Sequence, residues 1–292
     1  MGVKGIGLIL AGAVLLLFSA WPLYLMGQEL FLERKVRQQA DIDRIYVNFL
    51  ELGKVEILGR GVPIPVTRIS VRNRVEAAGE SREPLSYDDY YRYMENTASE
   101  TVRYTREYTW ENQVIRIEDE TAPGVRSRDS RSRSPLRITI NQNDWSVSDP
   151  VEVRPYFLDE NRYHGYFGML TVRHRDHDQL VLVQRISEIG DFNVPSLAWR
   201  VLSIASDGQV REERFEYGER ADDPIRVKYI QQSSASPISF GYRSNMLHVW
   251  PSLWFPILYP WTTGGLGLLL LAAGGAVRRA DRRKNKSARH KQ

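Results

Sequence analysis

The sequence predicts a membrane protein with two transmembrane helices and a mainly β, extracytoplasmic domain (a β-rich α+β fold) between them. Long uncharged segments lie near both ends of the 292-residue chain, and a basic segment follows the second one. Short segments rich in β-branched and aromatic residues fill the middle. The expected division is a cytoplasmic N-terminus at 1–4, spans at 5–28 and 253–277, an outer domain at 29–252 and a basic cytoplasmic tail at 278–292.

The charge is distributed unevenly along the chain. The formal net charge is +4, but without Lys4 and the tail the chain has 31 Lys or Arg against 35 Asp or Glu. A slightly acidic body argues against a nucleic-acid partner. The hydrophobic content of 42% excludes a wholly disordered chain.

The first span is expected at 5–28, where no charged residue occurs. This length is sufficient to cross a hydrocarbon layer of about 30 Å. A cleaved signal peptide is the alternative, but Phe18-Ser19-Ala20-Trp21-Pro22 is a poor cleavage site. The second uncharged run, 244–277, ends at Arg278-Arg279 and is the clearer span.

The tail predicts the orientation, because basic residues beside a span are retained in the cytoplasm. Both termini are then cytoplasmic, although Arg34, Lys35 and Arg37 after the first span oppose this assignment. Aromatic residues at the expected outer ends of the spans agree with it. The orienting residues are Arg278, Arg279, Arg282, Arg283, Lys284 and Lys286.

Small residues recur in both spans and would let helices approach closely, within one chain or in a homodimer. Simple lipid-facing spacing is the alternative. The residues concerned are Gly7 and Ala11 in the first span, and Ala272, Ala276, Gly264, Gly265, Gly267, Gly274 and Gly275 in the second.

The outer domain is expected to begin with a juxtamembrane helix at 29–44, which contains good helix formers and no Gly or Pro. A second helix is expected at 87–97, because Ser86 and Asp89 resemble a capping box. A polar segment at 118–133 is expected to be an exposed loop. Strands are expected at 66–75, 101–110, 136–140, 151–157, 167–174, 180–186, 198–204, 210–217 and 225–230.

One cluster carries metal-ligand chemistry: His174, Asp176, His177 and Asp178 fall within five residues between two expected strands. A solvated hairpin turn is the preferred interpretation, because a metal site needs further fixed ligands.

A tyrosine-rich run from Tyr87 to Trp110 is compatible with either a sugar-stacking platform or core packing. The motifs of serine hydrolases, zinc peptidases and nucleotide-binding loops are absent from the sequence. The sequence therefore identifies no catalytic residue and no cofactor.

The C-terminal part contains Trp199-Arg200-Val201, Asp207-Gly208, Val227-Lys228-Tyr229 and Pro237 before the glycine-rich span. In this order it resembles a bacterial family of two-helix membrane proteins of unknown function, over about residues 195–277. The resemblance implies an outer β domain with an Asp-Gly turn and a V-x-Y strand, and a place in the bacterial inner membrane. Residues 45–190 have no counterpart, and the family brings no active site.

These observations favour a non-enzymatic membrane protein whose outer domain binds or scaffolds an envelope protein or a cell-wall ligand. A transmembrane signal transducer is the first alternative. An envelope hydrolase or metal-dependent enzyme that uses His174 and His177 is the second.

Overall fold

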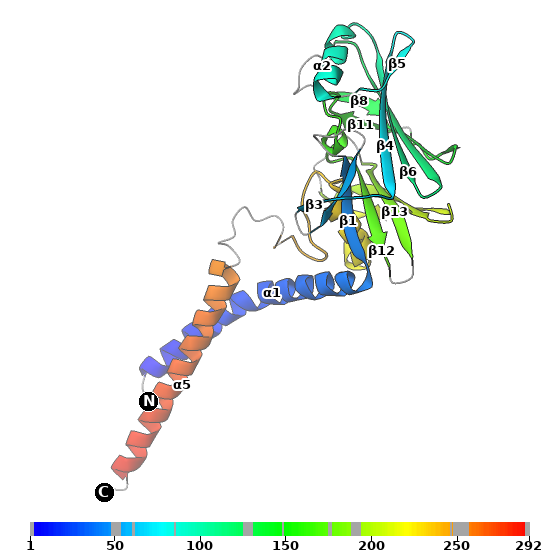
Figure 1. Cartoon of the computed structure of the whole chain (residues 1–292). Coiled ribbons are helices and arrows are strands. Elements are labelled where there is room, and N and C mark those ends of the chain that lie inside the picture. Colours follow the sequence, from blue (N-terminus) through cyan, green and yellow to red (C-terminus); the bar gives the residue numbers. More distant parts are fainter. Residues whose placement is uncertain are drawn as a thin grey trace. The chain divides into compact units, whose positions relative to one another are not determined.

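The computed structural model describes residues 3–47, 54–59, 62–84, 86–124, 131–147, 149–174, 177–187, 194–245, 247 and 257–289. The chain forms two compact units. Unit 1 comprises Met1–Arg34 and Ser239–Gln292, and unit 2 comprises Lys35–Ile238. Figure 1 shows that unit 1 is helical and that unit 2 contains the strands.

Unit 1 is built from helix α1 (Val3–Gln39), whose last residues belong to unit 2, a short irregular turn η4 (Ile257–Thr262) and helix α5 (Thr263–Arg289). Two segments, Gly5–Gln39 and Leu258–Arg283, are long and apolar enough to cross a membrane. Their existence agrees with the two predicted spans. The second helix also continues beyond Val277 through most of the basic tail.

Helices α1 and α5 pack in antiparallel order through small residues (Figure 1). A Cβ atom added to Gly12 would lie 2.6 Å from the Gly267 carbonyl oxygen, and one on Gly274 would lie 2.9 Å from that of Gly5. Near the other end of the pair, the Ser19 and Thr263 hydroxyls are 2.8 Å apart. Buried positions recur every seven residues, at 5, 12, 19 and 26 on α1, at 260 in η4, and at 267 and 274 on α5. This repeat is typical of a left-handed helix pair.

Only some of the predicted small residues lie in the contact between α1 and α5 of one chain, and their use in a homodimer stays a prediction. Gly264, Gly267 and Gly274 do lie in the contact between the two helices, which we call the seam. Gly7, Gly265 and Gly275 have no neighbour within 4 Å of an added Cβ. Ala11, Ala272 and Ala276 are exposed. The prediction relied on four-residue spacing, whereas the seam follows a seven-residue repeat and so uses a different face of each helix.

Within unit 1, the buried carboxylate of Glu29 on α1 binds the backbone of residues 242–244. Glu29 is only 2% exposed and accepts hydrogen bonds from the backbone N–H groups of Tyr242 (2.7 Å), Arg243 (2.6 Å) and Ser244 (2.8 Å). A Cβ on Gly241 would lie 2.1 Å from the Ser244 backbone carbonyl oxygen and 2.6 Å from a Glu29 carboxylate oxygen, so glycine is required there. Charge-assisted bonds of this kind are about twice as strong as neutral ones.

The described residues of unit 2 form two large antiparallel sheets and one small one. Sheet A has the order β15-β14-β13-β12-β1-β2-β3, and sheet B has the order β10-β9-β7-β6-β4-β5. The strands of sheet A are β1 (Asp41–Val47), β2 (Val55–Gly59), β3 (Val62–Pro65), β12 (Phe167–Arg173), β13 (Asp178–Arg185), β14 (Ala198–Ala205) and β15 (Val210–Glu216). Those of sheet B are β4 (Ile69–Ala77), β5 (Glu80–Arg82), β6 (Val102–Trp110), β7 (Gln113–Thr121), β9 (Arg137–Ile140) and β10 (Asn143–Asp144), while β8 (Ser132–Pro135) pairs with β11 (Pro150–Val153).

The main core lies between the sheets. Ile45, Met169 and Leu180 of sheet A share one apolar cluster with Ile69 and Trp110 of sheet B. A second cluster forms where helix α2 (Tyr87–Asn96) covers the remainder of the same face of sheet B. The other face of sheet A is covered by helix α3 (Pro224–Ser233), which approaches so closely that a Cβ on Gly168 would lie 1.8 Å from the Ser233 oxygen.

The β-rich class was predicted correctly, and so was helix α2, in which the Asp89 N–H donates to the Ser86 hydroxyl (3.1 Å). Three predicted segments need correction. The helix expected at 29–44 ends at Gln39, because β1 begins at Asp41 and pairs with β2 and β12. The segment 225–230, which was also the V-x-Y strand of the resemblance, is helical because Asp223 caps α3 and Pro224 occupies its first turn.

The loop expected at 118–133 is the third correction. Residues 118–121 belong to β7 and residues 132–133 to β8, while residues 125–130 lie outside the described residues. Within β7, the Asp119 side chain is fully buried. A polar composition suggested solvent, but the fold supplies Asp119 with a buried partner.

Candidate functional site

A cavity of about 680 Å³ opens in unit 2 beside the junction of α1 and β1. Its walls come from the last turn of α1, from β1, β2, β12 and β13, from the start of β4, the end of β6, and one side of α3. The volume is in the range of pockets that bind small organic ligands. We regard this cavity as the candidate site.

On one side of sheet A, the cavity lies where the core face becomes polar, and its lining also includes residues of the other face and of α3. On β1, Ile45 and Val47 belong to the core, so strand alternation places Asp41 and Asp43 on the same face. The neighbouring strands change in the same way. Beyond the core residues Met169 of β12 and Leu180 of β13 come Thr171 and Arg173 on one strand and Asp178 on the other. Asp43 is opposite Thr171, and Arg173 lies between Asp41 and Asp178 in the register.

On the opposite wall, Ile69 and Trp110 of sheet B line the cavity beside Arg68 and belong to the core cluster. Ile57 of β2, which is next to β1 in sheet A, packs against the same cluster. Trp110 is only 4% exposed. The cavity therefore offers an apolar surface facing a row of charged side chains.

Some of the charged side chains that line the cavity have ion-pair partners, and others have none among the described residues. Arg173 contacts Asp178 at 3.1 Å, and Arg68 contacts Asp178 at 3.7 Å and Glu111 at 3.9 Å. No hydrogen bond or ion pair from another described residue reaches the side chain of Asp41 or Asp43. Burial raises the pKa of Asp43, the charge of Asp41 raises it further, and Arg173 partly opposes them.

The predicted histidine cluster lies at the tip of the β12–β13 hairpin. The His174 N–H donates to the His177 carbonyl at 2.9 Å, and the two rings are stacked at 4.9 Å. Asp178 turns toward Arg173 and lines the cavity, and Asp176 lies outside the described residues. Among the residues that the structure describes, no group of three or more metal-ligating side chains occurs. The hairpin tip agrees with the sequence, and the interpretation that His174 and His177 hold no metal stays a prediction.

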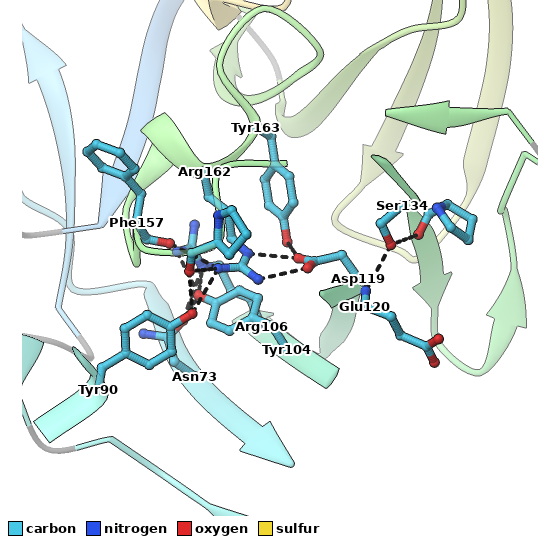
Figure 2. Close-up of polar contacts among 12 residues, drawn as sticks. Asn73, Tyr90, Tyr104, Arg106, Asp119, Glu120, Ser134, Phe157, Arg162 and Tyr163 are labelled. Carbon is cyan, nitrogen blue, oxygen red and sulfur yellow. Dashed lines mark hydrogen bonds and ion pairs between the residues drawn. The ribbon is translucent and has the colours of Figure 1, made fainter. Parts of the chain in front are cut away.

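A second cluster of charged groups is entirely internal. Figure 2 shows Arg162 and Tyr163 both directed at Asp119. Arg162 donates two hydrogen bonds of 2.7 Å to the carboxylate, and the Tyr163 hydroxyl donates one of 2.6 Å. The side chains of Arg162 and Asp119 are 0% exposed. The guanidinium of Arg162 also lies over the Tyr104 ring, at 3.9 Å from its centroid.

Arg106 extends this buried network. Its guanidinium donates to the Asn73 side chain at 3.1 Å and to the Tyr104 hydroxyl at 2.8 Å, and also to the Leu158 carbonyl. All of these acceptors are neutral. Together with Asn73 on β4 and Asp119 on β7, Arg106 on β6 forms a polar layer between the two apolar clusters.

The protonation states in the network follow from burial. Burial raises the pKa of Tyr90 to about 12. Burial and the charge of Asp119 raise the pKa of Tyr163 well above its ordinary value. Burial alone would lower the pKa of Arg162, but Asp119 more than offsets this effect. The tyrosines are therefore neutral donors, and Arg162 remains charged beside Asp119 at physiological pH.

The sugar-stacking interpretation of the tyrosine-rich run does not hold. Tyr90, Tyr93, Tyr104, Tyr108 and Trp110 are all buried. Within this run only Tyr87 and Tyr91 are half-buried, and both pack against the α2 cluster. The run therefore belongs to the interior of unit 2, with its first part on helix α2 and its last part on strand β6. The cavity could not be predicted from the sequence, because its residues come from distant segments.

Comparison with protein-family models, curated proteins and solved structures gives no match for this chain.

Proposed function

We propose that this chain is an integral membrane protein of the bacterial envelope whose outer unit binds a small ligand in the cavity beside β1. Its two apolar helices serve as anchors in the lipid bilayer, with both termini in the cytoplasm. The proposal assigns it no catalytic residue and no cofactor. Unit 2 would then present the cavity to the extracytoplasmic space.

One observation carries the proposal. The core face of sheet A ends in Asp43 and Asp41, whose carboxylates lack hydrogen-bond and ion-pair partners among the described residues. Half-burying a carboxylate without a partner costs free energy. Sequences violate such local rules mainly at functional sites. A ligand that completes the wall of the cavity would explain why these residues are present.

Signal transduction is the second candidate, and a separate observation favours it. Val36 and Arg37 line the cavity and lie in the last turn of α1, the helix whose N-terminal part is the first apolar segment. A ligand in the cavity would therefore contact the same helix that enters the bilayer. Coupling requires that ligand binding favour one of two arrangements of this helix.

The proposal is tested by blocking the cavity in the full chain. Thr171 is half-buried in its wall, and a Thr171→Trp variant would fill part of the space. Ser70→Trp is the matched control, because Ser70 is exposed on β4 and does not line the cavity. Native mass spectrometry of protein extracted from its own membranes would detect a bound small molecule.

We expect wild type and Ser70→Trp to retain a molecule of the same mass and Thr171→Trp to lose it. Equal retention of the molecule by all three proteins would show that it binds outside the cavity, and this result would contradict the proposal. Absence of any bound molecule from wild type, together with no binding of added organic compounds of any charge, would also contradict it.

A further inference from the structure

We infer that the ligand of this cavity is an organic cation, with an ammonium or guanidinium group bound by Asp43 and an apolar body against the wall of Trp110. The inference rests on the proposed function, since it names the chemical class that the same cavity accepts. It follows from the partners of the charged groups, from desolvation and from the shape of the wall.

The partners of the charged groups indicate the sign of the ligand's charge. Four cationic side chains line the cavity: Arg37, Arg68, Arg173 and Lys228. Each already has an interaction partner, which for Arg68 and Arg173 includes Asp178. The groups left without a hydrogen bond or ion pair from a described residue are the carboxylates of Asp41 and Asp43. An incoming cation could pair with them without breaking an existing contact.

Desolvation identifies Asp43 as the principal anchor. Asp43 is half-buried, whereas Asp41 is exposed. Both lie on one face of β1, two residues apart, so their charges repel one another and would repel an anionic ligand. A cation at Asp43 would offset the repulsion and the lost hydration, and burial makes that pairing stronger than it is in water.

The apolar wall indicates that the ligand is more than a simple ion. Ile69 and Trp110 of sheet B face the charged row, Ile57 lies beside that row on β2, and the cavity of about 680 Å³ is far larger than an ammonium ion. An aromatic or aliphatic body attached to the cation would remove this apolar surface from water. A bare metal ion would leave it exposed.

The test compares three probes of similar shape and different charge: phenethylamine, 3-phenylpropionate and 2-phenylethanol. The full chain is reconstituted in nanodiscs of neutral phospholipid and titrated with each probe by calorimetry. We expect the amine to bind more tightly than the alcohol, and the alcohol more tightly than the carboxylate. Loss of the charged partner in Asp43→Asn should weaken amine binding by at least about tenfold.

Two controls separate recognition from folding. Asp88→Asn alters an exposed aspartate in the first turn of α2 and should leave amine binding unchanged. Asp43→Asn should melt at or above the wild-type temperature at neutral pH. The raised pKa of Asp43 means that this group stabilises the fold only at acidic pH, and that its contribution is lost as the pH rises through the raised value.

The two proposals fail in different ways. If the carboxylate probe binds best, or if Asp43→Asn binds the amine as well as wild type does, the cation inference is wrong and the cavity still binds a ligand. If phenethylamine binding persists in Thr171→Trp, the amine occupies another place and the inference is also wrong. Failure of all three probes to bind at millimolar concentration would overturn the inference, and with no ligand retained from membranes the proposed function fails as well.

Discussion

Asp119 and Glu120 are neighbours on β7 but lie in opposite environments. Asp119 is buried with Arg162, whereas Glu120 pairs at 3.1 Å with Arg103 on the outer face, where the two side chains are 41% and 47% exposed. Removing one partner of a buried pair leaves an uncompensated charge and costs about 3–5 kcal/mol. Exposed pairs contribute about 0–1 kcal/mol because water screens them.

We therefore expect Asp119→Ala to destabilise unit 2 severely and Glu120→Ala to have little effect. The measurement is unfolding of the full chain in detergent, followed by circular dichroism in the β-sheet region. The double variant Asp119→Leu with Arg162→Met should recover part of the loss, since it removes both charges together. Equal behaviour of the two alanine variants would show that the buried ion pair is not a stabilising feature.

The sequence predicts the strand that carries Arg106 but not the buried network around it. The strand expected at 101–110 is confirmed, and its alternation puts Arg106 on the buried face. It could not supply the acceptors, because Asn73 and Leu158 are remote in sequence. The sequence places Asp119 in a loop for the same reason, since its partner Arg162 is 43 residues away. The surroundings of Asp43 could not be predicted either, because its cavity forms only when the two sheets are assembled.

At the scale of single elements, the seam between α1 and α5 makes a specific prediction. Gly12 contacts the backbone of α5, whereas Gly7 on the same helix has no neighbour within 4 Å of an added Cβ. A side chain at Gly12 must push the helices apart and lose packing that associates helices in lipid. We expect Gly12→Val to lower the melting temperature of the full chain in detergent and Gly7→Val to leave it nearly unchanged. The reverse ranking would mean that the helices pair through the other face.

Local signals at element ends were more informative than the patterns inside them. The segment 225–230 alternates like a strand, yet Asp223 accepts from the Arg226 N–H at 3.0 Å and begins a helix. A cap followed by proline is a helix-start signal. Similarly, the residues of 29–44 favour a helix throughout by their helix propensity. This propensity does not reveal that Asp41–Val47 pairs with two neighbouring strands. Pairing of this kind depends on chain segments more than 100 residues away, such as β12.

At the scale of the whole molecule, the antiparallel contacts of α1 and α5 constrain the topology. Gly5 lies beside Gly274, and Ser19 lies beside Thr263, so the two ends of the chain lie at the same end of the helix pair. If both helices cross a membrane, both termini must be on one side of it. The helix contacts do not choose the side. The choice comes from the tail, where the basic residues after Val277 favour the cytoplasm.

The chain has no cysteine, so single cysteines can report the topology without background. Glu83→Cys places an exposed thiol in unit 2, and Arg283→Cys places one near the end of α5. We expect a charged, membrane-impermeant maleimide added to intact cells to label Glu83→Cys, and to label Arg283→Cys only after permeabilisation. The cysteine-free parent is the control. Labelling of Arg283→Cys alone would invert the orientation and place the cavity in the cytoplasm. Labelling of both residues in intact cells would mean that unit 2 and the tail share one side, which rules out α5 as a span.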